Sequence, residues 1–80
     1  MSRQIEQLVK MANQIALNVA AGQDEVIVAR ETAAHIRKFW TPAMRRQLLD
    51  FRRAGGAVAP AVAIALAALD NTDSNRSDTQ

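Results

Sequence analysis

The chain lacks cysteine and has little else from which a metal or catalytic site is built. None of its 80 residues is cysteine, and only one, His35, is histidine. Disulfides, thiolate metal sites and cysteine nucleophiles are therefore excluded. Zinc or iron needs several converging His, Cys or carboxylate ligands, and the acidic residues are scattered along the sequence. We assign no catalytic, cofactor-binding or metal-binding residue to this chain.

Glycine and long apolar runs are also scarce. The pair Gly55-Gly56 lacks the lysine, hydroxyl residue or third glycine of a phosphate-binding loop, so we interpret it as a turn. The longest apolar stretch, residues 57–69, is interrupted by Pro60 and is too short to span a bilayer. The amino-terminal segment has no apolar core of a signal peptide. We expect a cytoplasmic protein without a membrane span, and the lack of cysteine fits a reducing compartment.

The apolar residues that are present support only a small core. Of 39 apolar residues, 16 are alanine, which leaves 23 larger apolar side chains. Such a core suffices for one domain of a few helices. A catalytic cleft needs a larger scaffold around it, so composition favours binding over catalysis.

The spacing of apolar residues predicts helices. Apolar positions recur three and four residues apart, and capping residues such as Asp24 and the Thr41-Pro42 pair mark helix starts. Gly22 and Gly55 are suited to helix ends. Residues 58–66 also alternate like a strand, but their alanine content favours a helix. The predicted helices span residues 2–20, 24–39, 42–53 and 60–69.

The expected fold is all-α, a small cluster of four short helices with a disordered C-terminal tail. We predict a single helical domain over residues 1–69. Residues 70–80 contain no apolar side chain whose burial would offset the entropy of ordering them. They form the predicted tail.

Positive charge is concentrated in the middle of the chain. Residues 30–53 carry seven basic and two acidic side chains, a net charge of +5, whereas the whole chain has a net charge of +2. In the predicted helix 42–53, one face carries Met44, Leu48 and Phe51. The opposite flank carries the arginines, and Leu49 is expected to lie exposed among them. A dry centre with an arginine-rich rim is typical of a protein interface, although a solvated basic face fits the same pattern.

Phe39 and Trp40 place two of the three aromatic residues at one helix end. Trp40 is expected in the core, and one of the two rings is a candidate interface anchor that faces outward. The candidate partner-binding residues are Phe39, Trp40, Arg45, Arg46, Leu49, Arg52 and Arg53.

A nucleic-acid-binding module is an alternative, because two helices and a basic second helix resemble a helix-turn-helix. The Thr41-Pro42 joint is short for that motif, and only Gln47 accompanies the arginines for base-edge contacts. The net charge is low for a phosphate binder. A free-standing helical adaptor is the other alternative.

A longer motif resembles a known family. The string FWTPAMRRQLL at residues 39–49 follows MANQI at residues 11–15 and precedes Gly55-Gly56 and Pro60. Over about residues 8–69 the chain resembles the delta subunit of NAD-dependent formate dehydrogenase. It departs from the family pattern at Ala43, often basic there, and at residues 17–19, where an aromatic residue is common.

The resemblance implies a non-catalytic accessory subunit of a bacterial hetero-oligomer that oxidises formate to carbon dioxide and reduces NAD. It implies that this chain binds the large catalytic subunit and supports assembly or stability of the complex. The molybdenum or tungsten pterin, the iron–sulfur clusters, FMN and NAD are then expected on partner subunits, and no cofactor on this chain.

Overall fold

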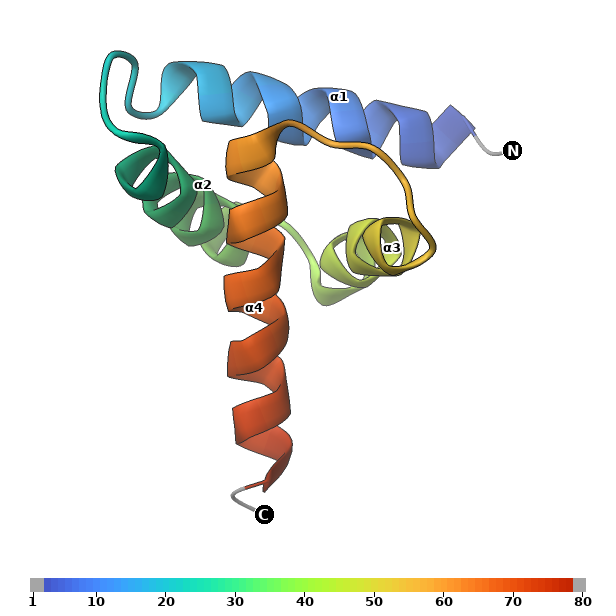
Figure 1. Ribbon diagram of the computed structural model, residues 1–80. Helices are drawn as coiled ribbons and strands as arrows, with labels where there is room; N and C mark the ends of the chain where they lie inside the picture. Colours follow the sequence, from blue (N-terminus) through green and yellow to red (C-terminus); the bar gives the residue numbers. More distant parts are fainter. Residues whose placement is uncertain (1–2, 79–80) are drawn as a thin grey trace.

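The computed structural model describes residues 3–78, and within them the side chains of residues 4–70. It contains four helices, α1 (Arg3–Asn18), α2 (Glu25–Phe39), α3 (Pro42–Arg53) and α4 (Pro60–Asp78), and no strand between residues 3 and 78. Figure 1 shows α1 lying across one end of α4, with α2 and α3 on either side of α4. The predicted all-α cluster of four helices is confirmed.

The helix boundaries agree with the prediction to within one residue except at two ends. Helix α1 ends at Asn18 rather than at residue 20, and Gly22 adopts a positive φ of 82° in the turn that follows. Helix α4 continues to Asp78, beyond the predicted end at Leu69. A helix that has already been nucleated adds residues without needing to bury each one. Residues 79 and 80, and all side chains from residue 71, lie outside the described part, and the disorder predicted for the tail stays a prediction there.

Side-chain caps fix the starts of α2 and α3. The carboxylate of Asp24 accepts a hydrogen bond from the backbone N–H of Val26 at 3.3 Å. The hydroxyl of Thr41 accepts one from the N–H of Met44 at 3.2 Å, and Pro42 occupies the first helical turn. Both caps satisfy donors that the first turn of a helix leaves without an internal partner.

Glycine ends α3. Gly55 has a φ of 98°, and its N–H donates to the carbonyl of Arg52 at 3.0 Å. The N–H of Gly56 donates to the carbonyl of Phe51 at 2.9 Å. This pair of bonds is the Schellman motif, which needs a residue that tolerates the left-handed conformation. It reverses the chain toward α4.

The core lies where α2 and α4 cross, and α2 packs more extensively against α4 than against any other helix. Small side chains such as Ala33 and Ala65 are buried in both helices and allow a close approach, while Ile36 and Leu66 fill the space between them. The buried hydroxyl of Thr32 donates a hydrogen bond to the carbonyl of Val28 at 2.7 Å, so this buried polar group has a hydrogen-bond partner.

A side-chain hydrogen bond links α1 to the start of α4. The Oδ1 atom of Asn13 accepts a hydrogen bond from the backbone N–H of Ala59 at 3.1 Å. The carbonyl of Ala59 in turn accepts from the N–H of Ala63 at 3.0 Å, which makes Ala59 the residue that opens α4. Asn13 therefore fixes where α4 starts relative to α1.

Candidate functional site

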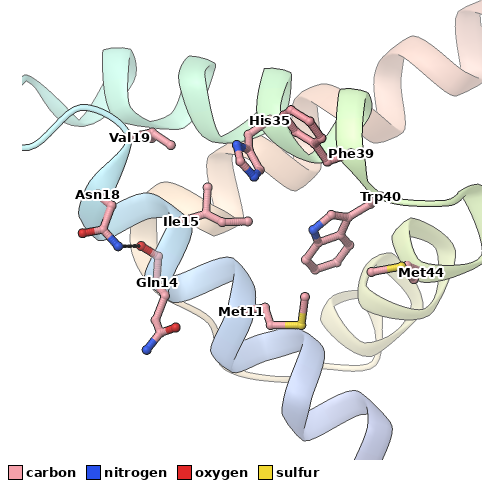
Figure 2. Close-up of a pocket in the computed structure, with 9 residues that line it drawn as sticks. All are labelled: Met11, Gln14, Ile15, Asn18, Val19, His35, Phe39, Trp40 and Met44. Carbon is pink, nitrogen blue, oxygen red and sulfur yellow. Dashed lines mark hydrogen bonds between the residues drawn. The ribbon is translucent and has the colours of Figure 1, made fainter.

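An apolar groove opens between α1, the end of α2 and the start of α3 (Figure 2). Its volume is about 630 Å³, within the range of protein pockets that hold ligands. We call it the aromatic groove. Its lining residues are Met11, Gln14, Ile15, Asn18, Val19, His35, Phe39, Trp40 and Met44.

Two adjacent rings at the groove have opposite environments. Phe39 ends α2 and is 66% exposed, whereas Trp40 is 6% exposed. The difference follows from the backbone, because Trp40 leaves the helix in an extended conformation with φ −93° and ψ 147°. That change directs the indole inward, toward the side of Met11 and Met44 in Figure 2. Trp40 is a core residue as predicted, and Phe39 is the ring that faces outward.

The exposed ring of Phe39 is flanked by two polar groups of the same helix. The imidazole of His35, one turn earlier, lies 4.7 Å from it between ring centroids, with an interplanar angle of 45°. The ammonium nitrogen of Lys38 lies 5.7 Å from the ring centroid. Contacts of both kinds favour a fixed ring position. Phe39 is therefore held at the groove by its own helix.

Three basic residues are close in sequence to residues that line the groove. Lys10 lies one turn before Gln14 on α1, Lys38 lies beside Phe39, and Arg45 follows Met44 on α3. Arg45 is half-buried, and its Nε atom is buried without a hydrogen-bond partner among the residues that the structure describes. A buried donor without a partner is costly. Of the three, Lys38 is placed at the apolar groove by its contact with the ring of Phe39.

The predicted arginine face of α3 is not a continuous free surface. The guanidinium of Arg52 donates to the carbonyl of Gly56 at 3.0 Å. Arg53 forms an ion pair and hydrogen bond with Asp70 of α4 and lies 3.6 Å from Asp50. Both arginines therefore stabilise the end of α3, whereas Arg46 is exposed and has no such role within residues 3–78.

The expectation that Leu49 is exposed among these arginines is wrong. Leu49 is 8% exposed and belongs to the core, next to the fully buried Leu48. Adjacent helical positions point about 100° apart. Because α3 packs against both α1 and α4, its buried arc is wide enough to include both leucines. The prediction assumed one narrow apolar stripe.

Sequence reasoning found Phe39 and Trp40 but missed the groove itself. The residues of α1 that line it, such as Met11 and Ile15, are half-buried and follow the same apolar spacing as the core residues of that helix. Their spacing does not distinguish a groove wall from a core face. The spacing of His35 and Phe39, four residues apart, places them on one side of the helix, which is the signal that the sequence offers for the contact of their rings.

The described residues contain neither a candidate metal site nor a candidate membrane span. Among the described side chains of residues 4–70, no three His, Asp or Glu groups lie close enough to share a metal ion. None of the helices between residues 3 and 78 combines the length and hydropathy of a membrane span.

The fold and its groove define a class, a small four-helix protein with an apolar concavity on its surface. Within this class the sequence matches one family over residues 7–68. The chain belongs to the family of NADH-dependent formate dehydrogenase delta subunits, FdsD, which confirms the resemblance stated from its motif. Searches of curated proteins and of solved structures gave no significant match.

Proposed function

We propose that this chain is a non-catalytic accessory subunit of an NAD-dependent formate dehydrogenase complex in the bacterial cytoplasm. It binds the large catalytic subunit, which carries a molybdenum or tungsten pterin, and it supports assembly or stability of the complex. Iron–sulfur clusters, FMN and NAD belong to partner subunits, and this chain holds no cofactor.

The observation that carries the proposal is the family match over residues 7–68, because the family is that of a formate dehydrogenase subunit. The chemistry of the chain agrees with a binding role. It has no cysteine for an iron–sulfur cluster or a pterin metal and one histidine. The aromatic groove gives it a surface that suits a protein partner.

The proposed contact residues divide into two groups. Phe39, Arg45 and Arg46 present exposed or half-buried groups to a partner, and Arg52 and Arg53 lie further along the same helix. Trp40 forms the buried wall behind Phe39. Leu49 is buried in the core of this chain, so we no longer propose it as a contact residue.

The test is a pull-down of the tagged chain from its native host, with metal analysis of the eluate. We expect the eluate to contain the large subunit in stoichiometric amount, together with molybdenum or tungsten, after a wash in moderate salt. A phosphate-binding module would instead recover nucleic acid, and its affinity would fall steeply as salt rises. Recovery of nucleic acid or of the chain alone would overturn the proposal.

A second measurement addresses the accessory role. A host that lacks this chain is expected to retain less assembled complex and less formate-dependent NAD reduction, and both are restored by the chain supplied from a plasmid. The purified chain alone is expected to oxidise no formate. Unchanged complex levels in the deletion strain would contradict a role in assembly or stability.

A further inference from the structure

We propose that the aromatic groove docks an amphipathic α-helix of the partner subunit whose apolar stripe is flanked by aspartate and glutamate. The inference rests on the proposed function, since it specifies the chemistry of the partner at one surface of this chain. Three observations carry it: the exposed ring, the shape of the groove walls and the charge beside the ring.

The first observation is the exposed apolar surface at the groove. Phe39 is 66% exposed although its ring position is fixed by His35 and Lys38. A fixed aromatic ring loses little conformational freedom when a partner covers it. Met11 and Met44 lie at the inner end of the same groove, and their flexible thioethers adapt to the side chains of a partner. The groove therefore has the anatomy of an apolar anchor site.

The second observation is that the walls are helices. The groove residues Met11 and Ile15 of α1, and Val19 directly after its end, are spaced four residues apart and form one ridge. A ridge of this kind packs into the space between side chains of another helix. Residues 3–78 contain no strand, so they offer no sheet edge to which an extended peptide adds. Helix-in-groove docking is the recognition mode that this geometry accommodates.

The third observation is the sign of the charge beside the ring. Lys38 lies over the ring of Phe39 at the groove, Arg45 follows the lining residue Met44 in the sequence, and none of the lining residues is acidic. The ammonium group of Lys38 is a favourable partner for a carboxylate that covers Phe39. Carboxylates beside the apolar stripe of the partner helix complement this charge. A phosphate backbone would match the charge but not the apolar floor.

The first experiment measures how much large subunit co-purifies with the tagged chain. Phe39→Ala is expected to lower the ratio of large subunit to chain by about tenfold, the loss typical of a central aromatic anchor. Leu17→Ala is the matched control, because Leu17 is 72% exposed on α1 and does not line the groove. It is expected to leave the ratio unchanged. Circular dichroism of both variants establishes that their helix content equals that of the wild type.

A charge comparison tests the acidic partner. Lys38→Glu is expected to lower the ratio more than Arg30→Glu, which makes the same charge change on α2 in a separate depression beside α4. Equal effects of the two variants would mean that net charge rather than the charge beside the ring matters, and would overturn the acidic-helix assignment.

Site-directed cross-linking identifies the occupant. The chain has no cysteine, so Gln14→Cys provides one attachment site for a photoreactive probe in the groove, and Leu17→Cys provides one outside it. In the purified complex, Gln14→Cys is expected to capture a peptide of the large subunit with net negative charge and helical apolar spacing. Capture of a non-acidic or extended peptide, or of nucleic acid, overturns the inference.

The outcomes separate this inference from the proposed function. A wild-type chain that recovers no large subunit contradicts the proposed function itself. A wild-type chain that recovers it, with Phe39→Ala equal to Leu17→Ala, leaves the proposed function intact and overturns the groove as the docking surface.

Discussion

Leu49→Ala is expected to lower the free energy of unfolding of the isolated chain by about 3 kcal/mol. The side chain of Leu49 is almost completely buried, with the residue 8% exposed. Truncation to alanine removes three carbon atoms, and each buried methylene is worth about 0.8 kcal/mol. The cavity that remains adds to this loss, and measured Leu→Ala changes in cores fall at about 2–5 kcal/mol.

A loss of this size is large for so small a protein. The free energy of unfolding of a domain is about 0.05–0.15 kcal/mol per residue, which gives about 4–12 kcal/mol for a chain of 80 residues. The melting temperature of a domain of 60–100 residues shifts by about 4–8 °C per kcal/mol. Leu49→Ala is therefore expected to melt more than 10 °C below the wild type.

The assay is thermal and urea unfolding followed by circular dichroism at 222 nm, the usual wavelength for helix, on the wild type, Leu49→Ala and Leu17→Ala. Leu17 is 72% exposed, so its truncation is expected to change stability by no more than about 0.5 kcal/mol. If Leu49→Ala melts with the wild type but no longer binds the large subunit, then Leu49 is an interface residue and the burial argument is refuted.

Three further substitutions test other parts of the fold. Trp40→Ala is expected to cost about 3–5 kcal/mol in urea unfolding because the indole is buried, and a stable variant would remove Trp40 from the core. Gly56→Ala is expected to cost about 1–3 kcal/mol because a Cβ there would overlap the ring of Phe51; a smaller cost in the Phe51→Leu background is the check. Asn13→Ala is expected to cost about 1–3 kcal/mol because it leaves the N–H of Ala59 unpaired, and faster amide exchange at that position would show the loss.

The sequence predicted local structure well because local signals are physical requirements of the backbone. Asp24 and Thr41 are capping residues wherever a helix starts after them, and Gly55 has the positive φ that its helix end needs. The aromatic groove was not predictable in the same way. It arises from the angle between α1 and α3, and no residue spacing within either helix encodes that angle.

Leu49 and Phe39 illustrate where single-helix reasoning fails and where it works. The burial of Leu49 depends on α3 contacting two helices at once, so a helical wheel with one buried stripe places it on the wrong face. The sequence left open that one of the two adjacent rings at the end of α2 faces outward. The break in the backbone at Trp40 decides which one, because it turns the indole inward and leaves Phe39 exposed.

Helix α2 packs mainly against α4 rather than against α1 and α3, its neighbours in the sequence. This packing has a consequence for the synthesis of the chain. The ribosome releases α2 before α4, so Ile36 and the alanines beside it have no cover until nearly the whole chain has emerged. The first three helices leave that face of α2 in water, which favours transient association with other apolar surfaces. Ribosome-bound chains that end before Pro60 are therefore expected to be cleaved by protease within α2, and full-length chains to resist.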